Sequence, residues 1–494
     1  MDRRFATLIG LYCSWLLIAS RLLIAANART WLFERYPEAP NFLALLSPVV
    51  EGTSVNASNK LFFWSLTSAL AGFLFGFDTV VISGAEKTIQ SLWQLSDFEH
   101  GIAISSALWG TVLGSMIGQF PTDRYGRRKT LLWIGILYLV SAVWSGLATG
   151  LWTFSIARFI GGVGVGISTV TSPLYIAELS PPHRRGRLAG LFQFNIVLGI
   201  LIALISNALI AQSGSEHAWR WMLGVEAFPA LLYTAMCVGL PESPRWLVAF
   251  RNDTQGAREV LRTLDPDTTP EQLDQDLAAL TAGRDTSHPS NRSSHAPFWS
   301  RSLALPIAIA FLVAFFNQMS GVNAILYFAP RIFELTGLAE QAALLQSVGI
   351  GVTNLIFTFV GLWLIDRLGR KTLLILGSFG YIASLGLCAW AFSTKTYWLV
   401  PGCIFAFIAA HAMGQGAVIW VLISEIFPDQ HRANGQALGS FTHWIFAALL
   451  TLVFPIAVTQ FAPEVIFGFF CFMMCLHLLW VFAMVRETKG VPLT

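Results

Sequence analysis

From about residue 60 onward, long apolar runs alternate with short polar segments. Each run is long enough to cross a hydrocarbon core of roughly 30 Å as an α-helix. The pattern therefore predicts an all-α membrane protein with twelve transmembrane helices. The expected spans are about 61–83, 102–120, 131–150, 152–176, 188–211, 219–240, 302–328, 342–364, 373–393, 398–424, 437–459 and 462–485.

The chain repeats itself at long range. The segment Asp123-Arg-Tyr-Gly-Arg-Arg128 follows the second span, and Asp366-Arg-Leu-Gly-Arg-Lys371 follows the eighth, 243 residues later. Ile176-Ala-Glu-Leu-Ser-Pro181 and Ile423-Ser-Glu-Ile-Phe-Pro428 form a second pair, 247 residues apart. Two motifs at nearly one offset predict two pseudo-symmetric halves of six helices each, with the substrate site between them near the middle of the membrane.

The spacing of the spans predicts four regions along the chain. These are an N-terminal extension (1–59), a first six-helix half (60–248), a polar linker (249–301) and a second half with a short tail (302–494). Within the linker, residues 255–264 and 270–280 have helical spacing, and residues 287–294 are typical of a flexible connector.

The N-terminal extension contains one further apolar stretch, Phe5–Ala19, after Arg3 and Arg4. It resembles a secretory signal peptide. Cleavage would place the next helix on the wrong side of the membrane, so we expect an uncleaved anchor, an interfacial helix or an upstream start codon. Asn56-Ala-Ser58 has the spacing of a glycosylation acceptor but lies inside in the expected topology.

Composition supports a membrane protein and argues against several other classes. Only 12% of residues are charged, against roughly 25% in average soluble proteins, and the mean hydropathy is +0.61. A net charge of +3 gives no reason to expect nucleic acid. The six cysteines form no C-x-x-C pair, and the sequence shows no metal cluster, nucleophile elbow or Walker motif. We expect neither an enzyme nor a bound cofactor or metal.

Lysine and arginine are distributed unequally between the two sets of loops. One set, which includes the two repeated arginine motifs, the linker and the C-terminal tail, holds 20 of them, and the other set holds four: Lys87, Arg220, Arg331 and Lys395. Because positive loops remain inside, we expect both ends of the twelve-helix core to be cytoplasmic, in a multi-pass protein of the cell membrane.

Two charged residues stand inside spans that are otherwise apolar. Asp78 lies in the first span and Arg158 in the fourth. Intramembrane charges are costly and generally mark an ion or proton pathway. Asp78 is therefore the candidate proton carrier and Arg158 its partner, unless the two form a static ion pair. His411 and His443 are weaker candidates for the same role.

The repeated arginine motifs predict an ion network on the inner face. Arginines there can pair with acids at neighbouring helix ends, and Glu178 and Glu425 are the expected acceptors. The alternative is a plain topogenic signal. The expected members of this inner-gate network are Asp123, Arg124, Arg127, Glu178, Arg184, Arg185, Asp366, Arg367, Arg370, Glu425 and Arg432.

Amide side chains gather in the seventh span and recur in the fifth and eighth. Amides offer a donor and an acceptor together, which matches a hydroxyl-rich solute, and flat aromatic rings suit the C–H faces of a sugar. Each amide alone is equally compatible with an interhelical hydrogen bond. The candidate contacts are Gln193, Asn317, Gln318, Asn323 and Asn354, with Phe75, Tyr327, Trp420 and Trp444 as aromatic faces.

Together, in this order and spacing, these motifs resemble the sugar porter family of the major facilitator superfamily. The resemblance covers about residues 60–490 and includes Gly76–Gly84, Asp123–Arg128, Arg158–Gly166, Pro173–Glu178, Arg185-Gly186, Pro241–Leu247, Gln318–Tyr327, Asp366–Lys371, Ser424–Pro428 and Arg486–Gly490. It implies rocker-switch alternating access for a hexose, pentose or cyclitol. It also implies sugar contacts at Gln193, Gln318, Asn323, Asn354 and Trp444, and proton coupling at Asp78 with Arg158.

The sequence departs from the family pattern in ways that affect the site. Asn317 replaces the first of two glutamines, and His443 replaces an Asn or Gln. Gln415 stands where some bacterial symporters place a sugar-facing Trp, and is added to the candidate contacts. Gly416-Ala417 lacks the usual proline, which puts the break of the tenth helix in doubt. Arg486 replaces the proline of a Pro-Glu-Thr-Lys-Gly ending.

The function predicted from these features is the import of a monosaccharide by proton symport, with lipid, sugar and protons as the partners. A monomer is expected because one chain contains both halves. The alternatives are a facilitative sugar uniporter, a cyclitol (inositol) transporter, a nutrient sensor that does not transport, and a multidrug exporter. A sensor would be expected to carry long soluble tails, and an exporter a more apolar site.

Overall fold

The computed structural model describes residues 57–181, 185–264, 268–287 and 297–489. Phe5–Ala19, Asn56 and Arg184 lie outside these residues, as does most of the connector expected at 287–294.

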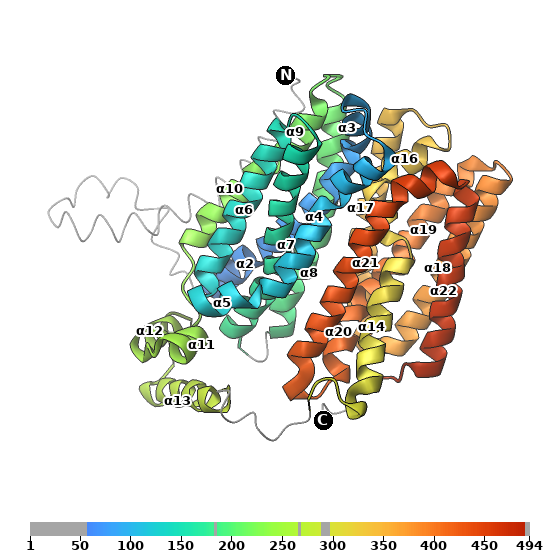
Figure 1. The fold of residues 1–494 in the computed structure, drawn as a ribbon. Helices are drawn as coiled ribbons and strands as arrows, with labels where there is room; N and C mark the ends of the chain where they lie inside the picture. Colours follow the sequence, from blue (N-terminus) through green and yellow to red (C-terminus); the bar gives the residue numbers. More distant parts are fainter. Residues whose placement is uncertain (1–56, 182–184, 265–267, 288–296, 490–494) are drawn as a thin grey trace, which may run out of the picture. The chain divides into compact units, whose positions relative to one another are not determined.

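The first six membrane-spanning helices form the N-terminal half, coloured blue to green in Figure 1. Their elements are α2 (Ala57–Val81), η2 (Ile82–Gly84), α3 (Glu86–Leu92), α4 (Asp97–Ile117), α5 (Gln119–Tyr125), α6 (Arg127–Leu147), α7 (Leu151–Leu179), α8 (Arg185–Ala211), α9 (Ala218–Gly224) and α10 (Ala227–Val238).

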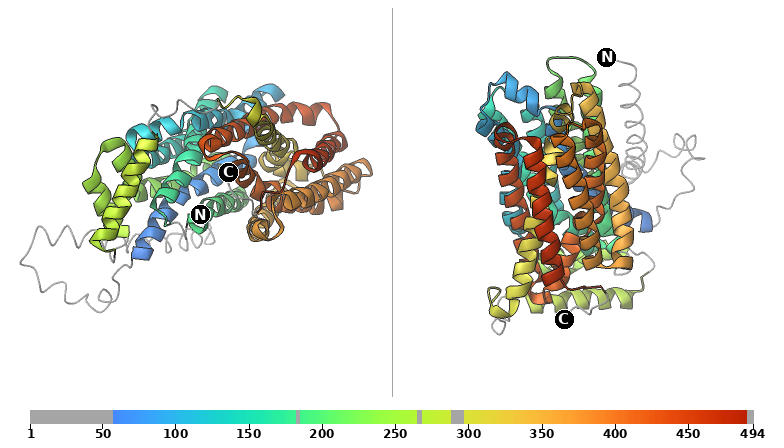
Figure 2. Two further views of the ribbon diagram at one scale, coloured as in Figure 1. Left: turned by 90° about the horizontal axis from the view of Figure 1, so that it is seen from below. Right: turned by 90° about the vertical axis from the view of Figure 1, so that its right-hand side faces the viewer.

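The second six form the C-terminal half, coloured yellow to red, and the view along the helices in Figure 2 separates it from the first. Its elements are η5 (Arg301–Leu303), α14 (Ala304–Met319), α15 (Val322–Tyr327), α16 (Ala329–Glu334), α17 (Glu340–Leu368), α18 (Arg370–Ser393), η6 (Tyr397–Leu399), α19 (Val400–Met413), α20 (Gln415–Ile426), η7 (Asp429–His431), α21 (Arg432–Gln460) and α22 (Pro463–Met484).

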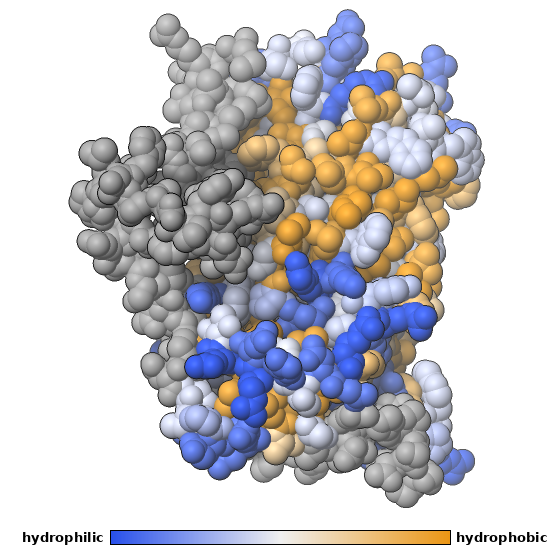
Figure 3. All heavy atoms as spheres, turned by 90° about the vertical axis from the view of Figure 1, so that its left-hand side faces the viewer, coloured by the Kyte–Doolittle hydropathy of each residue, from blue (hydrophilic) through white to orange (hydrophobic). Residues whose placement is uncertain are grey.

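The prediction of twelve membrane-spanning helices in an all-α fold is confirmed. The described residues contain 12 helices long and apolar enough to cross a membrane, from Lys60–Gly84 to Pro463–Met484. Large apolar side chains such as Trp133, Trp152 and Trp221 are exposed on their outer surfaces. Figure 3 shows this on one face, where hydrophobic residues dominate the upper part and polar residues gather at the lower end. Such a surface is suited to lipid.

The polar linker contains two helices at the positions with helical spacing, α12 (Thr254–Leu264) and α13 (Pro270–Ser287). Two shorter elements, α11 (Pro244–Trp246) and η3 (Leu247–Arg251), lead into them from the end of the first half. Val248, Ala257 and Leu277 are buried together and form a small apolar core of their own. The linker helices lie at the end of the N-terminal half that also holds α5 (Figures 1 and 2).

Helices α4 and α7 pack at unusually close range. A Cβ atom built on Gly162 of α7 would lie 1.8 Å from the carbonyl oxygen of Ala107 on α4. The glycine run of the fourth span therefore serves close helix contact. The run does not interrupt the helix, because α7 is continuous from Leu151 to Leu179.

The tenth span is broken despite the missing proline, which resolves the doubt raised by Gly416-Ala417. Helix α19 ends at Met413 and α20 begins at Gln415, with Gly414 between them at φ −89° and ψ −103°. A Cβ at Gly414 would lie 2.9 Å from both the carbonyl oxygen of Ala410 and Cα of Gly377. Glycine at this position provides the break that the sequence pattern assigns to proline.

The sixth and seventh spans are also interrupted. Glu226 lies between α9 and α10. Gly321, at φ +85°, separates α14 from α15. Both interruptions occur where polar side chains collect inside the helix bundle.

Candidate functional site

The two charges predicted inside the membrane lie against each other. Arg158 on α7 donates from Nη1 to Oδ1 of Asp78 on α2, and from Nη2 to the Asp78 carbonyl oxygen at 2.8 Å. Each residue is only 1% exposed. The carboxylate therefore faces the interior of the N-terminal half and not the acyl chains.

A third buried ionisable side chain lies beside this pair, and the sequence reasoning did not single it out. Glu226, at the break between α9 and α10, is 2% exposed. It interacts electrostatically with both Asp78 and Arg158. Its Oε1 has no hydrogen-bond partner among the described residues. The rule that identified Asp78, an acid inside an apolar span, applies equally to Glu226 and would have found it.

The ion pair is linked to the opposite half through the seventh span. Tyr327, at the end of α15, is 1% exposed and lies within electrostatic range of Arg158 and Asp78, close to Thr79. A residue predicted as a sugar contact thus lies within electrostatic range of the residues predicted to carry the proton.

Three of the predicted amides form one cluster at the break of the seventh span. Nε2 of Gln318 donates to Oδ1 of Asn317 at 3.0 Å, and Oε1 of Gln318 accepts from Nδ2 of Asn323 at 2.7 Å. The ring nitrogens of His443 on α21 lie 3.1 and 3.2 Å from Nε2 of Gln318. The histidine that replaces the family's amide therefore contacts this cluster directly.

Aromatic rings from both halves meet next to the amides. The ring centroids of Phe75 on α2 and Trp444 on α21 are 5.5 Å apart. His443 lies 4.7 Å from Trp444 and 5.3 Å from Trp420. Phe75, Trp420 and His443 are half-buried. This arrangement brings three of the predicted site residues (Phe75, Trp420 and Trp444) and His443 together where the halves face each other.

The remaining predicted contacts are less closely connected to this cluster. Gln193 on α8 is half-buried and Asn354 on α17 is 8% exposed. Within the described part of the chain, neither makes a hydrogen bond to the Gln318 cluster. Gln415 is fully buried, with Nε2 3.0 Å from Nε2 of His477 on α22. The side chain of Gln415 is therefore held within the C-terminal half.

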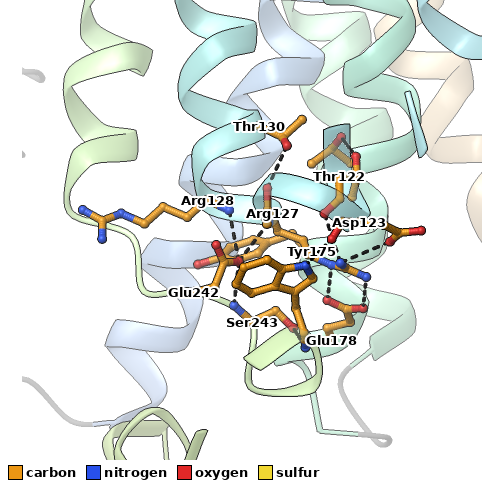
Figure 4. A network of polar contacts seen from close by, with 12 residues as sticks. Thr122, Asp123, Arg127, Arg128, Thr130, Tyr175, Glu178, Glu242 and Ser243 are labelled. Atoms are coloured by element: carbon orange, nitrogen blue, oxygen red, sulfur yellow. Dashed lines mark hydrogen bonds and ion pairs between the residues drawn. The ribbon is translucent and has the colours of Figure 1, made fainter. Parts of the chain in front are cut away.

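The first arginine motif forms the expected network, drawn in Figure 4. Arg127 donates from Nε and Nη2 to the two carboxylate oxygens of Glu178, each at 2.9 Å. Its Nη1 reaches the carbonyl oxygen of Thr122 at 3.1 Å and Oδ1 of Asp123 at 3.3 Å. Arg127 thereby ties α6 to the ends of α5 and α7.

The second motif reproduces this geometry in the C-terminal half. Arg370 donates from Nε and Nη2 to Glu425 at 3.0 and 2.8 Å. Its Nη1 reaches the carbonyl oxygen of Ile365 at 3.1 Å and Oδ1 of Asp366 at 3.2 Å. The sequence repeat therefore corresponds to a repeat in hydrogen bonding.

Each network contains a third acid that the sequence analysis did not single out. Glu242 Oε1 accepts from the backbone N–H groups of Arg127 and Arg128 at 2.8 and 3.2 Å. Glu487 accepts from those of Arg370 and Lys371 at 2.9 and 3.0 Å. Glu242 thus caps the N-terminus of α6 and Glu487 caps that of α18, where negative charge is favoured.

The carboxylates of Glu242 and Glu487 lie close to the glycines of the two motifs, at positions whose backbone conformation requires glycine. Gly126 and Gly369 have φ values of +95° and +89°. A Cβ there would lie 2.2 Å from Oε2 of Glu242 and 2.4 Å from Oε2 of Glu487. The glycine is thus needed for both its positive φ and its proximity to the carboxylate.

The electrostatic environments of the two acids differ. Burial raises the pKa of Glu242, and the hydrogen bonds from Ser243, Arg128 and Arg127 only partly offset this. For Glu487, burial also acts upward, but backbone hydrogen bonds from Lys489, Arg370 and Lys371 outweigh it and lower the pKa. The matched positions are therefore not equivalent in their response to acid.

The other predicted members of the inner network are placed more loosely. Arg124 is exposed, Arg367 lies 3.8 Å above the ring of Trp363, and Arg432 donates from Nε to the carbonyl oxygen of Ser424 at 2.9 Å. Arg184 is outside the described residues, and the side chain of Arg185 is not described. Their roles remain predictions.

Direct polar contacts between the halves lie at the end opposite the arginine motifs. Lys87 pairs with Glu334 at 2.5 Å, Arg331 donates to Gln90 at 3.1 Å, and Thr459 donates to Asp97 at 2.8 Å. Figure 1 shows α3 and α16, which carry several of these residues, together at the top. This end is therefore closed in the present conformation.

The family description "Sugar (and other) transporter" matches residues 64–494. The chain belongs to the sugar transporter family. Among curated relatives, it is 32% identical to the arabinose-proton symporter of Bacillus subtilis (91% of this chain and 97% of the relative). It is 33% identical to the D-xylose-proton symporter of Escherichia coli K12 (88% and 95%). It is also 33% identical to a glucose transport protein of Synechocystis (86% and 94%).

Solved members of the family share the fold. The Escherichia coli xylose transporter in a partially occluded inward open conformation matches with a TM-score of 0.77 at 30% identity, over 88% of this chain and 99% of that one. The same transporter bound to 6-bromo-6-deoxy-D-glucose matches with a TM-score of 0.73 at 31% identity, over 88% and 98%. The protein is therefore a multi-pass membrane transporter of the major facilitator fold and not an enzyme.

Proposed function

We propose that this transporter imports a monosaccharide, a pentose or hexose, together with a proton, by alternating access between its two halves. The observation that carries the proposal is the position of Tyr327. It lies within electrostatic range of the buried Asp78–Arg158 pair, on the same short helix as Asn323 of the amide cluster. Sugar binding at the cluster and proton binding at Asp78 would then bias the same segment.

The physical basis of coupling is the competition for Arg158. With Asp78 ionised, Arg158 is neutralised, and the desolvation cost of both charges is offset by their pairing. When a proton binds Asp78, Arg158 becomes free to interact with Glu226 instead. Such a change in the ion-pair partner of Arg158 would shift the balance between the outward-facing and inward-facing conformations.

The solute class follows from the amide cluster. Asn317, Gln318 and Asn323, next to Trp444 and Phe75, offer donors, acceptors and flat rings without a counter-ion. An uncharged polyhydroxylated ring matches this set, and the relatives that are named as arabinose, xylose and glucose transporters fall in that class. A facilitative sugar uniporter, with Asp78 and Arg158 as a static pair, is the second candidate, and a cyclitol carrier differs only in the ring.

The proposed setting is the cell membrane, with the arginine motifs and both ends of the twelve-helix core on the cytoplasmic side. The proposal also includes a monomeric carrier whose halves are residues 60–248 and 302–494, joined by the linker 249–301. The excess of Lys and Arg at the end with α5 and α13 supports this orientation. In it, the end closed by Lys87–Glu334 and Asp97–Thr459 is extracellular, and the conformation faces inward.

Uptake of a panel of labelled pentoses, hexoses and cyclitols in a host lacking its own sugar transporters tests the proposal. We expect concentrative uptake of at least one monosaccharide, abolished by a protonophore. Asp78→Asn should lose concentrative uptake but keep sugar exchange down a gradient, and Asp276→Asn, an exposed acid on α13, serves as the matched control. Normal concentrative uptake by Asp78→Asn would refute proton coupling, and an absence of uptake for every sugar would refute the solute class.

A further inference from the structure

The break in the tenth span is bridged by a buried chain of side-chain hydrogen bonds. His411 lies on α19 before the break at Gly414, and Gln415 lies after it, at the start of α20. Tyr381 on α18 contacts both His411 and Gln415. Its hydroxyl lies 2.7 Å from Nδ1 of His411 and 3.4 Å from Oε1 of Gln415. The chain thus connects the two helical segments α19 and α20 across the point where they separate.

The same chain continues to the last span. Nε2 of Gln415 lies 3.0 Å from Nε2 of His477 on α22. Nδ1 of His477 lies 2.8 Å from Oγ of Ser378, which is on α18. Tyr381, Gln415, His477 and Ser378 are each 0% exposed. Buried polar groups are costly unless they are satisfied, so this chain must be formed for the C-terminal half to be stable.

One arrangement of protons satisfies every link. Ser378 donates its hydroxyl proton to the carbonyl oxygen of Leu374 at 2.7 Å. His477 must then donate from Nδ1 to Ser378, which leaves Nε2 of the neutral ring to accept from Gln415. Gln415 accepts from Tyr381 through Oε1, and Tyr381 accepts from Nδ1 of His411. The donors therefore point in one direction from His411 to Leu374.

We propose that Tyr381, Gln415 and His477 form a clamp that fixes the angle between α19 and α20. The clamp makes Gln415 a positioning residue and not a sugar contact, which revises the expectation from its place in the sequence. The inference rests on the proposed function only for its effect on sugar affinity. Its effect on the break in helix 10 is independent of any substrate.

The clamp acts on the site through α20. Trp420 lies on α20, five residues after Gln415, with its ring 5.3 Å from that of His443. His443 in turn contacts Nε2 of Gln318. A change in the angle of α20 would move Trp420 against His443 and disturb the amide cluster. His477 also packs against Phe316 of α14, with ring centroids 5.5 Å apart, so α14 is held from the same side.

Hydrogen–deuterium exchange of the purified full-length protein, without sugar, tests the clamp directly. We expect Gln415→Leu and His477→Leu to speed exchange at the backbone amides of residues 412–418 by about tenfold, because local opening there becomes easier. The double variant should differ little from either single variant, because each one already interrupts the chain. Unchanged exchange in both single variants would overturn the proposal.

Two serines on α18 provide a matched control. Ser378 reaches α22, whereas among the described residues the Oγ of Ser384 donates only to carbonyl oxygens of its own helix, those of Gly380 and Tyr381. Ser378→Ala should reproduce the faster exchange and Ser384→Ala should not. Equal effects from the two would identify a general loosening of α18 and contradict the clamp. Tyr381→Phe, which removes a single oxygen, decides the matter if the leucine variants fail to fold.

A positioning role also predicts a specific kinetic signature. For the sugar that the wild type transports, Gln415→Leu should raise KM about five- to tenfold while the maximum rate changes less than about twofold. His477→Gln keeps an acceptor for Gln415 and should restore most of the affinity lost in His477→Leu. Loss of the maximum rate at unchanged KM would contradict positioning. If the wild type transports no sugar, the proposed function fails, and the exchange experiment alone judges the clamp.

Discussion

Arg331 and Glu86 belong to different halves, and Nη1 of Arg331 lies 3.5 Å from Oε2 of Glu86. Nε2 of His100 approaches the same carboxylate oxygen at 3.0 Å, and its ring lies edge-on to Phe328, with centroids 6.0 Å apart. Glu86 and His100 are almost fully buried. A carboxylate from one half thus depends on a guanidinium from the other to offset its desolvation.

Removal of that guanidinium should open this end of the transporter. In Arg331→Ala, the buried carboxylate of Glu86 loses its charged partner from the C-terminal half, and exposure to water becomes the better alternative. We expect the conformation open at this end to gain about tenfold in population. Distances between spin labels placed on α3 and α16, measured by double electron–electron resonance, would report the change.

The control for this experiment is Lys395→Ala, which removes a positive charge from an exposed side chain in the loop before η6. Because no ion pair in the described residues involves Lys395, its distance distribution should match that of the wild type. An unchanged distribution in Arg331→Ala as well would show that the Arg331–Glu86 contact does not hold the halves together.

Glu226→Gln should weaken coupling to the proton. With an amide at this position, Arg158 has no second carboxylate to pair with when Asp78 is protonated, so that state becomes less favourable. We expect the concentrative uptake ratio to fall by about tenfold, with exchange of sugar down a gradient retained. Glu216→Gln, an exposed acid shortly before α9, is the control and should behave as the wild type. Equal uptake ratios for Glu226→Gln and Glu216→Gln would remove Glu226 from the proposed pathway.

The sequence could predict the spans but not all of their interruptions. Length and apolarity alone determine whether a segment can cross a membrane, so the twelve spans could be located to within a few residues. The break at Gly414 depends on a backbone conformation and on the nearby Gly377 and Ala410, which no local pattern reveals. A missing proline was therefore a poor guide to the tenth helix.

Long-range partners explain the rest of what the sequence could not show. Glu178 and Glu425 could be matched to Arg127 and Arg370 because both members of each pair belong to repeated motifs. Glu242 binds the backbone of Arg127 from 115 residues away, and a backbone N–H leaves no side-chain signature. The environment of Gln415 likewise depends on His477, which belongs to a different helix.

The bidentate pair of Arg127 and Glu178 predicts a difference between the two halves. Lysine cannot reproduce the two parallel hydrogen bonds of a guanidinium. The Arg127 and Glu178 side chains are 5% and 3% exposed, against 11% and 20% for Arg370 and Glu425. Arg127→Lys should therefore lower the free energy of unfolding by about 1–3 kcal/mol, and Arg370→Lys by less.

Thermal unfolding of the detergent-solubilised protein would measure both variants. Arg128→Lys, at the adjacent exposed position, should have little effect. Within the described segments the Arg128 side chain makes a single hydrogen bond, from Nη2 to the carbonyl oxygen of Val238 at 2.7 Å. A larger loss for Arg370→Lys than for Arg127→Lys would contradict the order expected from burial.

The matched acids Glu242 and Glu487 should respond oppositely to pH. Because the pKa of Glu487 is lowered in the folded protein, its stabilising contribution is present above the unfolded pKa of about 4.3 and is lost as the pH falls through the folded value. Because the pKa of Glu242 is raised, the folded state favours its protonated form. The stabilisation that the protonated Glu242 gives to the folded state is present below about pH 4.3. It is lost as the pH rises through the pKa of Glu242 in the folded protein.

Melting temperatures recorded between about pH 3 and pH 7 should therefore separate the two glutamine variants. Glu487→Gln should be less stable than the wild type at neutral pH, with a deficit that shrinks in acid. Glu242→Gln should gain on the wild type as the pH rises, because the amide avoids the cost of an ionised, buried carboxylate while still accepting a hydrogen bond from Arg127. Parallel pH profiles for the two variants would show that the repeated positions share one electrostatic environment, contrary to the different burial and hydrogen bonding of Glu242 and Glu487.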